Sequence, residues 1–198
     1  MTPEHVVAIL AFSVAAAGTP GPSNALLTAT GANVGVIRGL PALVGVVLSM
    51  GLMMFIVAFG LATVILENAA LLVGVRWIGA AVLCWFAWQI ATSRGTGAGH
   101  FGRPVGFFGA AGFQWINPKS WLISASAAAT FLSQSDGPIY SQAILLGALF
   151  MLAALPSCLP WLAFGAVLQR LLRSERSMRI FNIGMGILLA ASAVVLLT

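Results

Sequence analysis

Charged residues are scarce in this sequence. Only 7% of its 198 residues are charged, 60% are hydrophobic, and the mean hydropathy is +1.03. A soluble globular domain carries about a quarter of its residues as charges, so this composition excludes that class and indicates an integral membrane protein. The apolar runs reach about 20 residues, the length of a spanning helix, and they lack the alternating ten-residue pattern of a membrane barrel.

Cysteine and histidine are also scarce, with two of each. Cys84 and Cys158 lie in separate apolar runs, form no CxxC motif and have no nearby histidine. We therefore expect no disulfide framework, no metal site and no cofactor. His5 and His100 fall outside the apolar runs and no GxSxG sequence occurs, which argues against an intramembrane enzyme.

Charges, prolines and glycines divide the chain into six apolar spans joined by short connections. The predicted spans are 6–32, 40–66, 70–92, 105–132, 139–168 and 180–197. No stretch is left for a soluble domain. The fold class that we predict is an all-α integral membrane protein with six transmembrane helices in a single domain, residues 1–198.

The basic residues gather on one side of this predicted topology. Seven of the nine lie in the loops between spans one and two, three and four, and five and six. Positive loops stay cytoplasmic, so we predict that both termini lie outside. These topology signals also explain the net charge of +5, and we expect no nucleic-acid partner. For the arginines in 170–179, binding of anionic lipid head groups is an open alternative.

Two spans contain helix-breaking sequences at membrane depth. Span one is interrupted by Gly18-Thr19-Pro20-Gly21-Pro22-Ser23-Asn24, and span four by Asn117-Pro118. Irregular backbone in hydrocarbon costs several kcal/mol for each unpaired group and is tolerated only where it is buried in protein or lines a cavity. The breaks therefore indicate a functional site, with a simple proline kink as the alternative.

A new half-helix is expected to start after each break. Asn117 suits the N-cap and Pro118 the first helical position, while Pro22 and Asn24 can start the matching half-helix. A helix N-terminus presents free N–H groups and a partial positive charge, which together bind anions. We predict that the two ends converge near the bilayer midplane.

Lys119 directly follows the second break and is the only lysine of the chain. An ammonium group within a span costs about 2.5–3.5 kcal/mol, and no acidic residue lies inside a span to neutralise it. Its side chain either extends to the membrane surface or binds an anionic group such as a substrate carboxylate. The candidate substrate-binding residues are Pro20, Gly21, Pro22, Ser23, Asn24, Asn117, Pro118 and Lys119.

A weak internal repeat relates the two halves of the chain. Pro118 lies 98 positions after Pro20, and the tripeptide Ala-Phe-Gly at 58–60 recurs at 163–165. These matches pair span one with four and span two with five. Two copies of a three-span unit enter the membrane from opposite sides, so we predict an inverted repeat, about 1–95 and 104–198, which is typical of secondary transporters.

Glycines and tryptophans near the breaks have simpler interpretations. The two GxxxG steps at Gly31, Gly35 and Gly39 indicate close helix packing more than substrate contact. Trp115 and Trp121 flank the second break and are candidates to line a cavity. Trp161 is interpreted as a packing or interface residue.

With these motifs the sequence resembles the LysE/RhtB family of bacterial amino-acid exporters over essentially its whole length. The resemblance rests on the run Thr19–Leu27, on Asn117-Pro118-Lys119, and on Gly31, Gly35, Arg38, Gly39 and Gly45. It implies export of amino acids or close derivatives across the bacterial inner membrane. It also implies energy from the proton gradient or the membrane potential, and a homodimer.

Two departures from the family pattern shape the expected substrate. The usual Pro-Gly-Pro-Asn reads Pro-Gly-Pro-Ser-Asn here, so the polar role in the first break falls to Ser23 or Asn24. Members that export lysine or arginine are expected to carry acidic residues within their spans, and this chain has none. We therefore favour neutral amino acids, because a second positive group would remain unneutralised.

The predicted mechanism is alternating access. Lys119 and the half-helix ends hold the substrate carboxylate, and carbonyls freed by the breaks take its ammonium group. Lys119 loses its proton when its anionic partner leaves. The alternative is a non-transporting membrane scaffold or assembly protein, which would account for the glycine seams but not for two broken spans.

Overall fold

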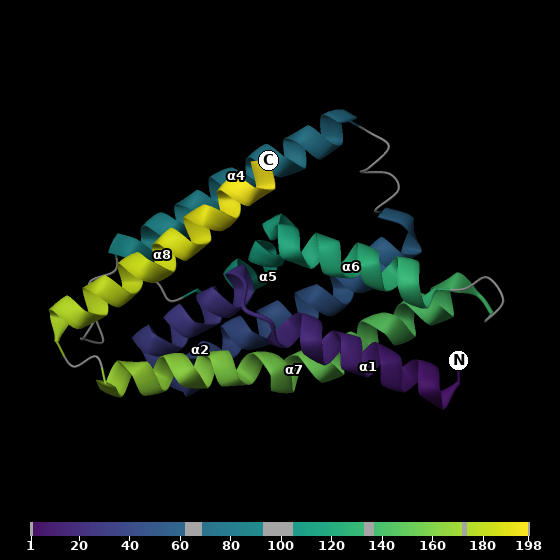
Figure 1. Cartoon of the computed structure of the whole chain (residues 1–198), viewed down its shortest axis with the longest axis horizontal. Coiled ribbons are helices and arrows are strands. Elements are labelled where there is room, and N and C mark those ends of the chain that lie inside the picture. Colours follow the sequence, from purple (N-terminus) through teal and green to yellow (C-terminus); the bar gives the residue numbers. More distant parts are fainter. Residues whose placement is uncertain (1, 62–68, 93–104, 133–136, 172–173, 198) are drawn as a thin grey trace.

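The computed structural model of the chain describes residues 2–61, 69–92, 105–132, 137–171 and 174–197 (Figure 1). Within these residues the regular secondary structure is entirely helical. By length and composition, three helical stretches are apolar enough to cross a membrane: Pro22–Gly60, Ile139–Leu168 and Glu175–Val194. The predicted all-α membrane class agrees with this architecture.

The helices of the described residues cover the predicted apolar segments, whereas their arrangement as six membrane spans stays a prediction. They are α1 (Pro3–Gly18), α2 (Pro22–Ile56), the short π-helical segment η1 (Val57–Leu61), α4 (Ala69–Thr92), α5 (Phe107–Ile116), α6 (Pro118–Phe131), α7 (Ile139–Leu171) and α8 (Glu175–Leu197). The break predicted in span one separates α1 from α2. The break predicted in span four separates α5 from α6.

The connection between the first two spans is shorter than predicted. We expected a loop at 33–39, but the backbone there is helical except at Gly35, which has φ 77° and ψ 176°. A straight helix of 35 residues would be about 52 Å long, well beyond the ~30 Å hydrocarbon core. Instead, the chain reverses at this point (Figure 1). Because a positive φ favours glycine, Gly35 serves the turn.

The packing role predicted for the other two glycines is confirmed. A Cβ added at Gly31 would lie 2.0 Å from the carbonyl oxygen of Leu162 in α7, and one at Gly39 would lie 2.5 Å from the Leu162 side chain. Gly165 repeats this on α7, where a Cβ would lie 2.0 Å from the Thr28 carbonyl oxygen. The backbones of α2 and α7 therefore touch, which is possible only for glycine.

The remaining helices form a second group beside this seam. Helices α4 and α8 lie side by side along most of their length, oblique to the rest (Figure 1).

The two pairs of helices that flank the breaks run in opposite directions. Helix α1 and the first part of α2 run away from the end that holds the N-terminus, whereas α5 and α6 run toward it (Figure 1). The two broken spans are thus antiparallel.

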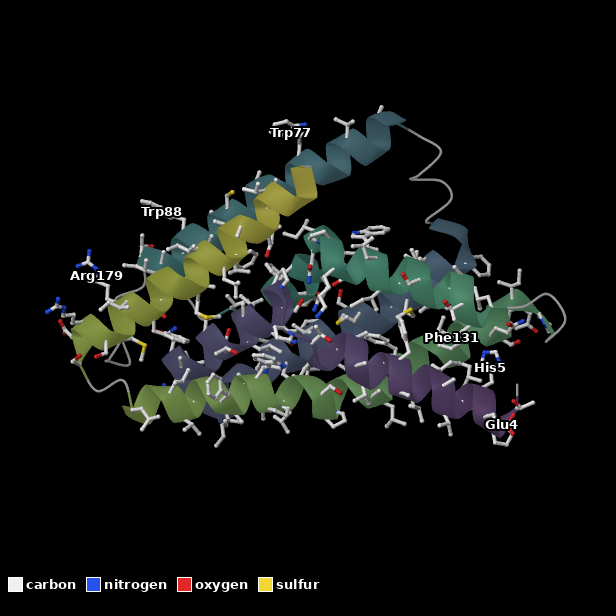
Figure 2. The ribbon with its side chains drawn as sticks, in the orientation of Figure 1. Glu4, His5, Trp77, Trp88, Phe131 and Arg179 are labelled. Atoms are coloured by element: carbon white, nitrogen blue, oxygen red, sulfur yellow. The ribbon has the colours of Figure 1, made fainter. Side chains whose placement is uncertain are left out.

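Large apolar side chains cover much of the outer surface. Trp77 and Trp88 of α4 are 64% and 70% exposed and point away from the bundle (Figure 2). Such a surface is abnormal for a soluble monomer and suits a lipid environment. Glu4 and Arg179 lie at opposite ends of the molecule (Figure 2). Three of the arginines used to predict topology, Arg94, Arg103 and Arg173, lie outside the described residues.

Candidate functional site

The first break is a gap of three residues between two helices. Helix α1 ends at Gly18 and α2 begins at Pro22, so residues 19–21 have no regular structure. In a continuous helix the Gly18 carbonyl would accept from the residue at position 22, but proline has no N–H. Two prolines, Pro20 and Pro22, therefore enforce the gap and leave carbonyl groups without helical partners.

Side chains supply those missing donors. The Nδ2 group of Asn24 donates to the carbonyl oxygens of Ala17 and Thr19, at 2.9 and 2.8 Å. The Trp161 indole N–H of α7 donates to the Gly18 carbonyl oxygen at 3.2 Å. Away from water each unpaired carbonyl would be costly, so these bonds stabilise the break. Trp161 thus does more than the packing predicted for it.

The second break is smaller and is capped by its own residues. Asn117 alone separates α5 from α6, and its Oδ1 accepts from the backbone N–H of Lys119 at 3.1 Å. Pro118 occupies the first helical turn, so the predicted N-cap is confirmed. The Trp121 indole N–H donates to the carbonyl oxygen of Trp115 at 2.7 Å. This bond spans the break. Neither tryptophan lines the cavity described below, although the sequence made both candidates to line one.

The two breaks touch through polar side chains. Ser23, in the first turn of α2, donates from Oγ to Gln114 Oε1 at 2.8 Å and accepts from Asn117 Nδ2 at 2.7 Å. Ser23 therefore faces the second break, while Asn24 turns back to the first. The sequence left open whether Ser23 or Asn24 is the polar residue of the first break, and both take part. Ser23 joins the two halves of the chain, and Asn24 stabilises the local backbone.

Lys119 bridges the breaks from the other direction. Its ammonium group donates to the Thr19 carbonyl oxygen and, at 3.4 Å, to that of Pro20. The side chain is partly buried and bends toward the first break. A Cβ at Gly21 would lie 2.7 Å from Lys119 Cδ, so the absence of a side chain there gives the lysine room.

A small cavity lies where these elements meet. Its polar lining comes from Ser23, Asn24, Asn117, Lys119, Ser120 and Cys158, and its apolar lining includes Met50 and Ile123. The cavity volume is about 10 Å³, which is enough for about one water molecule. Within the described ranges, no three His, Cys, Asp or Glu side chains gather as a metal site would require.

The sequence motifs identified most of this site. Of the eight candidate residues, Gly21, Ser23, Asn24, Asn117 and Lys119 line the cavity. The other three, Pro20, Pro22 and Pro118, shape the backbone, and the Pro20 carbonyl also accepts from Lys119.

Four residues of the site were missed as site residues: Gln114, Ser120, Cys158 and Trp161. For Gln114 and Ser120 a signal existed, because each lies three residues from Asn117 and both are polar residues in an apolar span. Trp161 and Cys158 carried no such signal, because only the packing of α7 brings them to the first break.

The chain is similar to known membrane transport proteins over nearly its whole length. The sequence profile of the LysE type translocator family matches residues 14–198. A cysteine/O-acetylserine efflux protein of Klebsiella pneumoniae is 33% identical over 174 residues, which cover 86% of this chain and 87% of that protein.

Proteins with the same name give similar matches in other bacteria. The one from Salmonella choleraesuis is 30% identical over 98% of both chains, and the one from Escherichia coli strain K12 is 29% identical over 98% of both. No solved structure matches the chain significantly.

Proposed function

The chain belongs to the LysE type translocator family of membrane transporters, and from that premise we propose that it exports small neutral amino acids. Cysteine and O-acetylserine are the first candidates, because similar proteins are named for their efflux. The observation that carries the proposal is the position of Lys119. Its ammonium group lies beside a cavity where two helix N-termini meet, held by backbone carbonyls and by no acidic side chain.

The site suits a carboxylate. The N-termini of α2 and α6 each contribute a partial positive charge, and Lys119 adds a full one. The apolar spans predicted from the sequence contain no Asp or Glu, so an anionic group of the substrate would be the natural counterion. A cationic amino acid would bring an additional positive charge that nothing here neutralises.

The bonds of Lys119 offer a way to couple binding to opening. In this structure they join α6 to the backbone of the first break, 100 residues away in the sequence. A carboxylate that draws the ammonium group away would release the carbonyl oxygens of Thr19 and Pro20. The cavity holds about one water molecule, so the two breaks must separate before an amino acid can enter. We propose that breaking these Lys119 contacts is one step of an alternating-access cycle.

The arrangement of the helices supports an inverted repeat as the framework for this cycle. The proposed units are about 1–95 and 104–198, and the broken spans of the two units run antiparallel (Figure 1). With Glu4 at one end and Arg179 at the other, we propose an inner-membrane orientation with both termini outside. A homodimer remains part of the proposal on the family resemblance alone, and cross-linking in native membranes would test it.

The energy source is proposed to be the proton gradient or the membrane potential. The chain has no Asp, Glu or His inside its apolar spans, so the titratable candidates are Lys119 and the substrate itself. In this cycle Lys119 would release its proton after the carboxylate leaves, and it would take up a proton again before the next substrate binds. Transport driven by an imposed pH step, compared with an imposed potential, separates the two sources.

Counterflow in proteoliposomes tests the function. Vesicles loaded with unlabelled cysteine or O-acetylserine should accumulate the labelled amino acid, and Lys119→Met should lower the initial rate by about tenfold or more through loss of the carboxylate contact. Arg179→Gln is the matched control, because that cation lies at the end of the molecule, and it should exchange like wild type. Absence of exchange by folded wild-type protein with any neutral amino acid would favour the scaffold alternative.

A further inference from the structure

Gln114 connects three polar side chains of the site, although it does not line the cavity. It is fully buried, and its Oε1 accepts from the hydroxyls of Ser23 and Ser120, both at 2.8 Å. Asn117 Nδ2 also donates to Oε1, at 3.4 Å. All three donors line the cavity, so the Gln114 amide lies directly behind its polar wall.

The orientation of this amide is fixed by the helix cap. Asn117 must turn its Oδ1 toward the backbone N–H of Lys119 to cap α6, which points its Nδ2 at Ser23 and Gln114. Gln114 can then face Asn117 only with its oxygen, because its amide nitrogen is a donor and so is Asn117 Nδ2. As a result, Gln114 Nε2 is buried and has no hydrogen-bond partner among the residues that the structure describes. A buried unpaired donor is unusual enough to need an explanation.

The consequence lies in the two serines. A hydroxyl has one proton and two lone pairs, and both Ser23 and Ser120 give their proton to Gln114. Ser23 uses one lone pair for Asn117, whereas no donor to the Ser120 oxygen is found among the described residues. The serine hydroxyls therefore present acceptors, not donors, to the cavity.

We propose that Gln114 is a positioning residue that makes Ser120, assisted by Ser23, the acceptor for the ammonium group of the substrate. This inference rests on the proposed function and deepens it. It adds an acceptor to the carbonyls of the first break, where the Thr19 carbonyl oxygen already accepts from Asn24 and Lys119. Ser120 and Lys119 are neighbours at the start of α6, so one helix turn would hold both ends of a zwitterion.

The proposal defines a substrate class. Small α-amino acids with a free ammonium group are accepted, whereas analogues that lack either charged end are rejected. A site built to bond a polar group discriminates strongly against a ligand without it, since its own polar atoms are then left unpaired. Each end is recognised by different residues, so mutations should remove the two discriminations separately.

Competition during counterflow of labelled cysteine under reducing conditions measures both discriminations. The probes are unlabelled cysteine, 3-mercaptopropionate, which lacks the ammonium group, and cysteamine, which lacks the carboxylate. Wild type should prefer cysteine over both. Ser120→Ala and Gln114→Met should lower the preference over 3-mercaptopropionate by about tenfold and leave that over cysteamine unchanged, with the loss seen mainly in KM. Lys119→Met should show the reverse pattern.

Matched variants separate positioning from structure. Gln114→Glu keeps an acceptor for both hydroxyls and should retain the preference that Gln114→Met loses. Ser124→Ala, a buried serine one helical turn beyond Ser120 that does not line the cavity, and Gln142→Met, a buried glutamine in α7, should behave like wild type.

The failures are distinguishable. A wild-type protein without cysteine exchange would overturn the proposed function and this inference with it. Wild-type exchange combined with an unchanged preference in Ser120→Ala would overturn this inference alone. Ser120→Ala removes a single atom, so it also decides the question if Gln114→Met fails to fold.

Discussion

The two broken spans solve the same problem in different ways. In the first, the carbonyls of Ala17, Gly18 and Thr19 receive hydrogen bonds from side chains of α2, α6 and α7. In the second, Asn117 caps the new helix by itself. The first break therefore depends on tertiary structure and the second is nearly self-sufficient. The contacts of Lys119 and Ser23 join the two breaks. We expect the first break to change more than the second if one half of the protein moves against the other.

The largest effect is expected where the first break is held against α7. A Leu at Gly165 would place atoms within 2.0 Å of the Thr28 carbonyl oxygen and push α2 away, carrying Trp161 from its partner. We expect Gly165→Leu to cost about 3 kcal/mol or more of stability. The thermal unfolding midpoint in detergent measures this. Gly184→Leu is the control, since a Cβ there meets nothing within 4 Å, and equal midpoints for the two variants would contradict the seam.

An identical substitution at the two breaks tests their difference directly. At the first break, Asn24→Ser places a short hydroxyl where an amide reaches carbonyls five and seven residues earlier, so both bonds are lost. We expect a cost of about 2–3 kcal/mol in the free energy of unfolding, measured with a denaturing detergent. A cost no greater than that of Asn117→Ser would show that the first break does not depend on this amide.

The dependence on α7 is tested by removing a single donor. Trp161→Phe keeps the ring but loses the N–H that bonds the Gly18 carbonyl, and Pro22 cannot replace it. The expected cost is about 1–2 kcal/mol, read from the same unfolding experiment. Trp88→Phe provides the comparison, because that indole is 70% exposed and should leave the stability unchanged. Matching losses in both variants would argue against the bond.

The smallest effect is expected at the second break. Asn117→Ser keeps a good N-cap residue and loses only the amide bonds to Ser23 and Gln114, so the cost should be about 1 kcal/mol. Circular dichroism should show unchanged helix content. A loss of helicity would mean that α6 needs Asn117 for more than its cap.

The sequence was most informative where the physics is local. Proline lacks an N–H and asparagine can cap a helix from its own position, so both breaks and the start of α6 followed from residue types alone. The sequence predicted a connection at 33–39, but it did not indicate that a single glycine with a positive φ makes the turn. The inverted repeat that the short motifs of the two halves indicate stays a prediction.

The sequence by itself determined that this is an all-helical membrane protein with two helix breaks, and that Lys119 directly follows the second break. Those properties depend on hydropathy and on the chemistry of proline and asparagine, each of which acts over a few residues. Only the tertiary structure decided the partners: Lys119 on the first break, Trp161 on Gly18, and Gln114 behind Ser23 and Ser120. These contacts join residues up to 143 positions apart, and they arise from glycine seams that set how closely the helices approach.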